Sequence, residues 1–214
     1  MDRRIKRLLD VSAGTIGLIL LAPLFLLIAM IIRLTMGSPV LFRQPRLGYK
    51  CCPFVLVKFR TMSNKLDRYG NLLPDSQRLT TLGRLMRRSS LDEFPQLWNV
   101  LKGEMSLVGP RPLFLKYEDL YTPEQKRRHE VKPGITGWAQ IKGRNVLSWE
   151  KKFDLDVWYV DHRNLFLDAR ILLNTFWQVF EGSGISQEGH VTMPEFTGSK
   201  KKHDRATKQL TLPI

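Results

Sequence analysis

The longest apolar run of the chain lies near its N-terminus. Residues 11–32 carry no charged side chain, and about 20 apolar residues are enough for a helix to span the hydrocarbon core of a bilayer. A cleaved signal peptide would end in small residues at an A-x-A-like site, whereas this run continues into IIRLTMG. The pattern therefore predicts a membrane-embedded segment that the mature chain retains.

Pro23 stands near the middle of this run. It lacks an N–H donor, and its ring clashes with the carbonyl of Ile19, so a kink or a break is expected there. Lys and Arg mark the cytoplasmic side of a membrane segment. They flank this run on both sides: Arg3, Arg4, Lys6 and Arg7 before it, and Arg33, Arg43, Arg46, Lys50, Lys58 and Arg60 after it.

Two topologies fit this arrangement. A hairpin that breaks at Pro23 would return both ends to the cytoplasm, with arms of about 17 Å that reach roughly halfway into the bilayer. Such a break exposes backbone groups to lipid, which is costly. A kinked helix that crosses the membrane is the alternative, and the residues alone do not decide between the two.

Behind the membrane segment, the pattern predicts one compact domain. Residues 40–61 alternate β-branched or aromatic residues with basic ones around a turn, as two strands do, and the later periodic segments favour helices. We expect an α+β fold, mainly helical with a small β-hairpin: a loop at 63–76, helices at 78–88, 95–102, 113–129, 148–162 and 168–181, and a loop at 132–145. The expected division is residues 1–36 for the membrane element, 37–182 for the domain, and 183–214 for a basic polar tail with the run SKKKHDRATK.

The helix expected at 78–88 is amphipathic and basic. Its apolar residues fall at helical spacing with arginines between them: Leu79, Leu82, Leu85 and Met86. Such a helix suits an anionic membrane surface. An ordinary helix that packs on the core, with its arginines in water, fits the pattern equally well.

The charge balance indicates which classes of partner suit the chain. Lys and Arg number 34 against 20 Asp and Glu, a formal net charge of +14, which suits an anionic partner such as nucleic acid, an acidic membrane or a phosphorylated substrate. Cys51 and Cys52 are the two cysteines, and an adjacent pair excludes a disulfide framework and a multi-cysteine zinc site. The four histidines lack a metal-ligand spacing, so zinc is not expected.

Two adjacent carboxylates give the most suggestive local pattern. Asp92 and Glu93 stand just before Pro95, and proline favours the first position of a helix. Carboxylates there, among arginines, can hold Mg²⁺, attack a phosphorus, or both. Adjacent residues cannot flank a glycosidic bond at the roughly 5 Å required, which argues against a glycosidase. The structural alternative is a capping box from Ser90 to Glu93. The arginines nearby are Arg87, Arg88 and Arg111.

Three further clusters could bind anions. Lys58, Arg60 and Thr61 end a predicted strand, Arg111 lies between two prolines, and Arg144 closes the glycine-rich segment KPGITGWAQIKGRN. Glycines with basic residues suit phosphate binding, although the chain has no Walker or dinucleotide fingerprint.

Taken together, these motifs resemble the bacterial sugar transferases, the small monotopic phosphoglycosyl transferases. The resemblance rests on five segments in the family's order, which cover about residues 2–180. They are the N-terminal segment from RRIKRLLDVSAG to FRQPRLG, then FVLVKFRTM, SSLDEFPQLWNVLKGEMSLVGPRPL, KPGITGWAQIKGRN and, more loosely, FDLDVWYVDHRNLFLDARILLNTFW.

The resemblance implies a reaction. Such enzymes move a phosphosugar from a UDP-sugar to undecaprenyl phosphate and release UMP, by a ping-pong mechanism with a covalent aspartyl-phosphosugar intermediate. This is the first membrane step of a bacterial glycan pathway (exopolysaccharide, O-antigen or glycoprotein), at the cytoplasmic face of the plasma membrane. It leaves open the sugar, and whether the chain forms a homodimer or joins other glycan-assembly enzymes.

The resemblance also assigns residues by motif position. Asp92 would be the nucleophile and Glu93 its partner, and the two would hold Mg²⁺. Arg87, Arg111 and Arg144 would bind phosphate, with Lys58, Arg60 and Thr61 as further phosphate or nucleotide ligands. In the family the membrane element is a re-entrant helix broken at a proline, which matches Pro23 and favours the hairpin with both ends cytoplasmic.

Two other interpretations compete. The net charge and the lysine-rich tail favour a membrane-tethered binder of nucleic acid or anionic lipid, in which Asp92 and Glu93 would be dispensable. A structural membrane anchor for a glycan-assembly complex would release no nucleotide from a UDP-sugar. The transferase is the interpretation that the motifs favour; we expect anionic lipids as partners and no nucleic acid.

Overall fold

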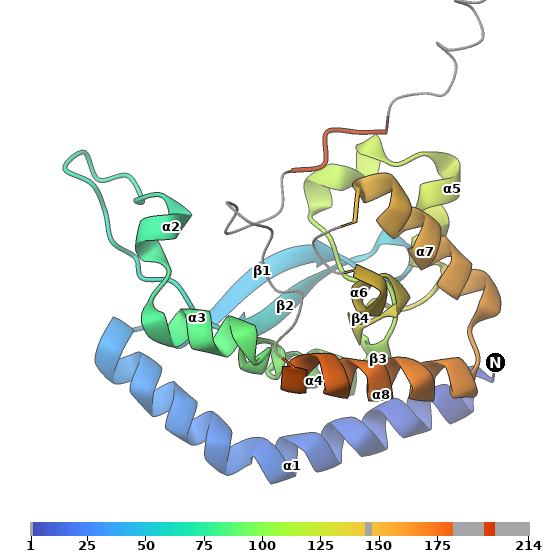
Figure 1. The fold of residues 1–214 in the computed structure, drawn as a ribbon, viewed down its shortest axis with the longest axis horizontal. Coiled ribbons are helices and arrows are strands. Elements are labelled where there is room, and N and C mark those ends of the chain that lie inside the picture. Colours follow the sequence, from blue (N-terminus) through green and yellow to red (C-terminus); the bar gives the residue numbers. More distant parts are fainter. Residues whose placement is uncertain (1, 144–146, 182–194, 200–214) are drawn as a thin grey trace, which may run out of the picture.

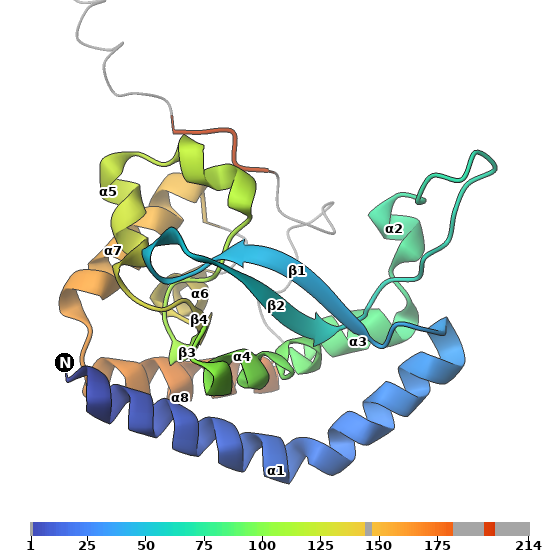
Figure 2. The same cartoon turned by 180° about the vertical axis from the view of Figure 1, so that it is seen from behind.

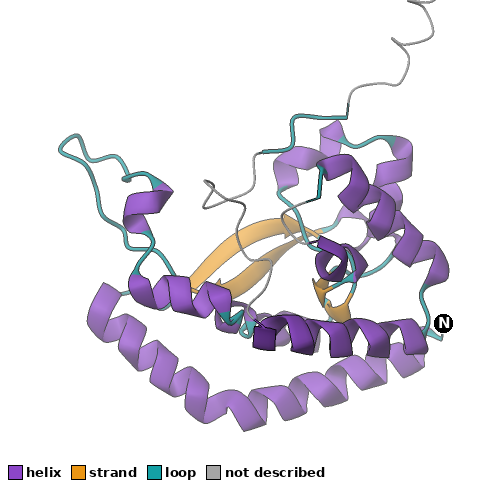
Figure 3. Cartoon of the chain, viewed as in Figure 1, coloured by secondary structure: helices purple, strands orange, loops and turns teal. Residues whose placement is uncertain are grey.

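The computed structural model describes residues 2–143, 147–181 and 195–199. It confirms the α+β fold class (Figures 1 and 3). The elements are α1 (Arg3–Met36), β1 (Leu41–Leu47), β2 (Pro53–Phe59), α2 (Asp75–Arg78), α3 (Thr81–Arg88), α4 (Gln96–Lys102), β3 (Ser106–Val108), α5 (Pro123–Lys126), β4 (Gly134–Thr136), α6 (Trp138–Gly143), α7 (Trp149–His162) and α8 (Leu165–Glu181). Short 3-10 turns occupy Tyr49–Cys51, Leu91–Glu93, Leu115–Leu120 and Arg127–Glu130.

α1 is one continuous helix of 34 residues with Pro23 inside it. It bends near its middle, and both arms turn towards the rest of the fold (Figures 1 and 2). Of the kink and the break expected at Pro23, the structure shows the kink and not the break that the family resemblance implies, because a proline removes one donor and displaces one carbonyl while the ladder continues on both sides. Among the described residues α1 alone has the length and hydropathy of a membrane helix, and only 11% of its most apolar window is buried, unlike a core helix.

A buried polar network attaches the N-terminal arm of α1 to the domain. Lys6 Nζ lies 2.8 Å from Asp10 and 2.9 Å from Asp168 of α8. Asp10 also accepts the backbone N–H of Leu107 at 3.2 Å, and Asp168 accepts the hydroxyl of Tyr159 at 2.7 Å. Because both carboxylates are buried and bonded more than once, they fix this arm against β3, α7 and α8.

Arginines complete the attachment at both ends of α1. Arg7 donates to the carbonyls of Val100 and Leu101 near the end of α4, at 2.5 and 2.7 Å. At the other end, the carbonyls of residues 36–38 all accept from the buried guanidinium of Arg60. Both ends of the membrane helix are therefore bound to the same folded domain.

The hairpin predicted at 40–61 is confirmed. β1 pairs antiparallel with β2, and Leu41 lies opposite Phe59. α4 runs along the other edge of β2, where the Asn99 side chain accepts from the N–H of Val57 at 3.1 Å and donates to the carbonyl of Val55 at 2.8 Å. The hairpin is thus held by α4, the helix that follows the predicted catalytic pair.

Most predicted helices are present, with shifted ends. α4 and α7 agree with the helices predicted at 95–102 and 148–162 to within one residue. α3 begins at Thr81 instead of residue 78, and α8 begins at Leu165 instead of residue 168. In α8 the Asn164 side chain accepts from the N–H of Leu167 at 2.8 Å and so starts the helix earlier.

The helix predicted at 113–129 is wrong. This stretch forms the turn Leu115–Leu120, then α5 and the turn Arg127–Glu130. Pro123 begins α5, and Thr122 closes a capping box with Gln125. Since a proline disfavours helical backbone at the residue before it, the chain cannot run through this point as one helix.

The loop predicted at 132–145 is also wrong, because it contains β4 and α6. β4 pairs in parallel with β3, with Ser106 opposite Gly134. The glycines that read as loop signals permit close packing of backbone: a Cβ on Gly134 would lie 2.1 Å from the nitrogen of Gly109. Local composition could not reveal this pairing of distant segments.

The tail predicted at 183–214 is described only at residues 195–199. There Phe196 is 3% exposed and packs with the buried rings of Tyr117, Tyr121 and Phe153. This short part of the tail belongs to the core. From residue 200 on, the lysine-rich run lies outside the described residues.

Candidate active site

The turn Leu91–Glu93 joins α3 to α4 and carries the two predicted carboxylates. The chain enters it through Ser90, whose φ of 56° lies in the left-handed region. Ser90 makes no side-chain cap bond, so the alternative capping box is not formed. Asp92 is only 5% exposed and Glu93 is half-buried. Both carboxylates are therefore held within the fold.

Gly83 sets the position of α3 against the end of β2. A Cβ at this position would lie 1.9 Å from the carbonyl oxygen of Thr61, so only a glycine permits this approach. One turn later, Arg87 Nε donates to Thr61 Oγ1 at 3.1 Å. Thr61 is buried, and its hydroxyl orients Arg87.

Five charged groups interact around the turn: Lys58, Arg87, Asp92, Glu93 and Arg111. Burial raises the pKa of the Asp92 carboxyl, and the neighbouring Glu93 carboxylate raises it further. The three cations act in the opposite direction on the same pKa. Burial lowers the pKa of the Lys58 ammonium, whereas Asp92 raises it. Three cations face two carboxylates, so the site carries excess positive charge and suits an anionic ligand.

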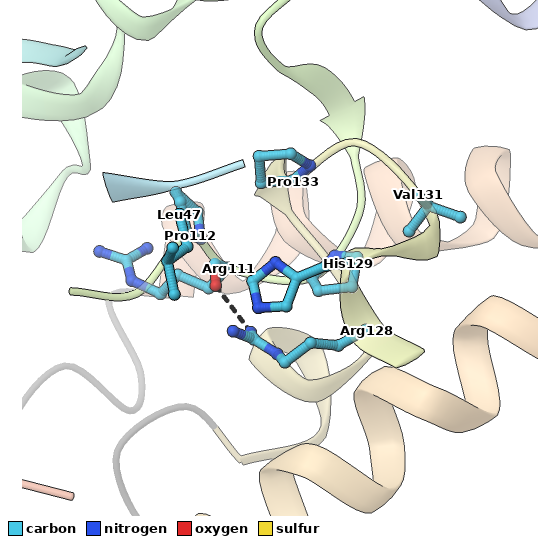
Figure 4. A pocket seen from close by; sticks show the side chains of 8 residues that line it. Leu47, Arg111, Pro112, Arg128, His129, Val131 and Pro133 are labelled. Atoms are coloured by element: carbon cyan, nitrogen blue, oxygen red, sulfur yellow. Dashed lines mark hydrogen bonds between the residues drawn. The ribbon is translucent and has the colours of Figure 1, made fainter. Parts of the chain in front are cut away.

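Arg111 reaches the turn from the loop after β3. Its guanidinium forms a bidentate pair with Glu93, at 2.5 and 3.3 Å. Its carbonyl accepts from Arg128 at 2.7 Å (Figure 4), and Arg128 is buried and paired with Asp156 at 2.7 Å. Figure 4 shows the Arg111 side chain pointing away from the residues that pack around its backbone. The fold thus fixes this backbone and leaves half of the side chain, 51%, exposed.

Not every predicted site residue joins this cluster. The two terminal nitrogens of Arg60 donate to the carbonyls of residues 36–38 at the end of α1, so we assign Arg60 to the attachment of α1 and not to phosphate binding. Arg144 lies outside the described residues. Pro23 lies in α1, two residues before Phe25, whose ring packs edge-on against Phe59 with centroids 5.7 Å apart.

Arg46 is a further candidate site residue, which the sequence motifs did not single out. Its guanidinium lies 3.7 Å over the ring of Phe114. Burial and nearby Arg111 lower its pKa to about 10. The strand alternation could have identified it: Phe42 lies opposite Lys58, and residues an even number apart share a face, so Arg46 and Lys58 share one face of the hairpin. Four residues separate them along the strand, roughly 13 Å.

The loop that carries Arg111 also connects this end of the hairpin to α7. The N–H of Leu47 donates to the carbonyl of Leu113 at 3.0 Å. In α7, burial and nearby Arg111 lower the pKa of Lys152 to about 8. Nothing in the helical pattern distinguishes Lys152 from a solvated lysine, so the sequence gives no sign of its position.

The carboxylate pair fits a hard divalent cation. Within the described parts of the chain, no group of three or more His, Cys, Asp or Glu could hold a metal ion. Mg²⁺ commonly takes one or two carboxylates and completes its shell with water and substrate phosphates. Asp92 and Glu93 meet that requirement, and a buried carboxylate among cations is also placed to attack a phosphorus.

Comparison with known proteins agrees with this geometry. The family model for bacterial sugar transferases matches residues 1–182. The chain is 57% identical to the uncharacterized sugar transferase EpsL of Bacillus subtilis over 91% of this chain and 96% of that protein. It is 41% identical to the UDP-glucose:undecaprenyl-phosphate glucose-1-phosphate transferase of Caulobacter vibrioides, over 79% of this chain and 67% of that protein.

A third relative is the exopolysaccharide production protein ExoY of Rhizobium meliloti, at 36% identity over 79% of this chain and 83% of that protein. The match to the family model extends from α1 through α8, and it includes the turn with Asp92 and the loop with Arg111. The chain therefore belongs to the bacterial sugar transferase family.

Proposed function

We propose that this chain transfers a phosphosugar from a UDP-sugar to undecaprenyl phosphate, with release of UMP, at the first membrane step of a bacterial glycan pathway. The observation that carries the proposal is the buried Asp92, surrounded by Lys58, Arg87 and the Glu93–Arg111 pair. The name of the Caulobacter vibrioides relative describes transfer of glucose 1-phosphate from UDP-glucose to undecaprenyl phosphate, which supports the class of reaction.

In the first step, an Asp92 carboxylate oxygen attacks the phosphorus that bears the sugar. A bond forms between this oxygen and the phosphorus, the bond from that phosphorus to the bridging oxygen breaks, and UMP leaves with the electron pair. Lys58, Arg87 and Arg111 offset the charge that develops on the phosphoryl oxygens. Their position next to Asp92 supports this role.

In the second step, a phosphate oxygen of undecaprenyl phosphate attacks the same phosphorus. The bond to Asp92 breaks, the carboxylate is regenerated, and undecaprenyl-diphosphate-sugar is released. The covalent intermediate divides one transfer between a soluble and a lipid substrate into two steps that need not bring both substrates together. Asp92 and Glu93 would hold Mg²⁺, which neutralises diphosphate charge when bound.

Arg46 extends the site along the donor. It lies on the Lys58 face of the hairpin, beside the loop of Arg111 and roughly 13 Å from Lys58 along the strand. The Phe114 ring fixes its guanidinium plane. Since the sugar-bearing phosphate occupies the end near Asp92 and Lys58, Arg46 binds the UMP end of the diphosphate.

α1 enters the membrane from the cytoplasmic face as a re-entrant helix. The attachment of both of its ends to one domain supports this topology, because a crossing helix would place its ends on opposite faces. Basic residues at both ends support the cytoplasmic side.

α3, α4 and α8 lie at one level between α1 and the rest of the domain (Figures 1 and 2). Large apolar side chains on them are more than half exposed, which supports contact with the membrane surface; they are Leu85, Trp98, Phe166, Leu173, Phe176 and Trp177. The exposed Arg84 and Arg88 of α3 suit anionic headgroups.

Asp92→Asn is expected to abolish UMP release, because an amide cannot act as the nucleophile. Glu93→Gln is expected to be nearly as severe, since it weakens the pair that holds Arg111. UMP release across a set of UDP-sugars, with undecaprenyl phosphate present, measures both effects and identifies the sugar. Asp154→Asn, at an exposed position of α7, is the matched control and is expected to retain activity. Substantial turnover by Asp92→Asn would contradict the proposal.

Mg²⁺ is expected to be required. EDTA should stop UMP release, and added Mg²⁺ should restore it, because hard oxygen ligands and a diphosphate favour this ion. Titration calorimetry should detect Mg²⁺ binding to the wild type and a weaker signal with Asp92→Asn. Full activity in EDTA would remove the metal from the mechanism.

Arg46→Gln is expected to raise the KM for the UDP-sugar about tenfold, since a hydrogen bond to a charged group contributes about 1.5–3 kcal/mol. Arg68→Gln is the matched control, because Arg68 is exposed in the segment between β2 and α2 and lines no proposed binding site. Steady-state kinetics at saturating acceptor measure the effect, and thermal unfolding checks the fold. An unchanged KM would show that Arg46 contacts only Phe114 and Gln44 and does not bind the donor.

Single cysteines test the topology of α1. In a Cys51→Ser, Cys52→Ser background, Arg3→Cys and Ser38→Cys are both expected to react with an impermeant maleimide only from the cytoplasmic face. Pro23→Leu restores the missing donor and removes the clash, so it should straighten α1 and reduce activity with the polyprenyl acceptor. Labelling of residue 3 from the outside in the protein that retains Pro23 would mean a crossing helix.

A further inference from the structure

A large groove lies between α1 and the hairpin, apart from the cluster around Asp92. Its volume is about 760 Å³. It is lined by α1, by both strands and by α4, and all but two of the lining residues are apolar. We call it the α1 groove; α1 contributes Leu18, Phe25, Leu26 and Ala29 to its lining.

The groove uses the face of the hairpin that the catalytic cluster does not use. Val55, Val57 and Phe59 are odd-numbered residues of β2 and line the groove, whereas Lys58 points to the other face. The groove wall also includes Trp98, which is 55% exposed, and Val55, which is 45% exposed. Apolar side chains left open beside a membrane helix suit an apolar ligand.

One end of the groove adjoins the turn Leu91–Glu93, which carries Asp92 and is called the catalytic turn from here on. Pro95 lines the groove and follows Asp92 by three residues, and Phe59 lines it directly after Lys58. The ring of Phe25 bridges these two segments, 5.7 Å from Phe59 and 6.2 Å from Phe94 between ring centroids. The groove therefore leads from the bend of α1 to the residues beside the nucleophile.

We propose that the α1 groove binds the isoprenoid chain of the acceptor next to its phosphate, an inference that rests on the proposed function. The acceptor phosphate must reach Asp92 while the attached chain stays in apolar surroundings. The groove is an apolar path along α1 that ends at Pro95, two residues after the turn that carries Asp92. Its two charged lining residues, Arg43 and Lys102, are both cations, so no lining residue repels the acceptor phosphate on its way to Asp92.

Filling the groove tests the proposal. Ala29→Trp and Val55→Trp place a large side chain in it from α1 and from β2. Leu27→Trp is the matched control, because Leu27 lies on α1 outside the groove lining, and two residues along a helix point to nearly opposite sides. Each variant is assayed in phosphatidylethanolamine–phosphatidylglycerol vesicles with undecaprenyl phosphate and with a two-isoprene phosphate, at saturating UDP-sugar.

Both groove variants are expected to raise the KM for undecaprenyl phosphate about tenfold or more and to leave the KM for the UDP-sugar unchanged. The KM for the two-isoprene acceptor should rise less than the KM for undecaprenyl phosphate, because the shorter chain fills less of the groove. Leu27→Trp should behave as the wild type. UMP release from UDP-sugar without acceptor, in one turnover, shows that each variant is folded.

Equal acceptor KM values for the groove variants and Leu27→Trp would overturn the proposal. The groove would then be a surface that contacts ordinary membrane lipid. An equal rise in KM for both acceptor lengths would also overturn the proposal. The substitutions would then affect binding of the phosphate, which both acceptors share, and not binding of the isoprenoid chain. Absence of UMP release from the wild type would instead refute the proposed function itself.

Discussion

The fold depends on the attachment of α1 to the domain at both of its ends. At one end Lys6 lies between two buried carboxylates, Asp10 and Asp168, which are also bound by a backbone N–H and a tyrosine hydroxyl. A buried ion pair is tolerated when its remaining bonds are satisfied, and removal of one partner leaves an uncompensated charge. Because the second end is held by Arg60 through three carbonyls, α1 cannot straighten without breaking one of these networks.

The same attachment positions the candidate active site. Three consecutive residues at the end of β2 have different neighbours. Lys58 faces the catalytic turn, Phe59 lines the α1 groove, and Arg60 binds the end of α1. The end of β2 is therefore shared by the membrane element and the site. Thr61, the next residue, orients Arg87. A change in the position of α1 would be passed directly to the residues around Asp92.

Much of this could be predicted from the sequence, because it depends on local patterns. Alternation gave the hairpin, helical spacing gave α4 and α7, and the proximity of Asp92, Glu93 and Arg111 along the chain anticipated their cluster. Such local patterns could not distinguish the role of Arg60 from that of Arg46. Both are basic residues of the hairpin segment, and their roles depend on which distant backbone or ring each side chain meets.

The pairing of β3 with β4 was missed for a related reason, since it joins segments about 30 residues apart through glycines. The bend of α1 was only partly predictable. Pro23 indicates a local disturbance, but the polar networks at residues 6–10 and 36–38 determine that both arms return to one domain.

In the proposed mechanism, Asp92 carries the phosphosugar between the two substrates. Intact-mass spectrometry of the full-length protein, incubated with its UDP-sugar and no acceptor, tests this most directly. The expected result is a mass increase of one phosphosugar, located on the peptide that contains Asp92 and removed when undecaprenyl phosphate is added. An enzyme that turns over with acceptor but never gains this mass, or gains it on another residue, would refute a covalent intermediate on Asp92.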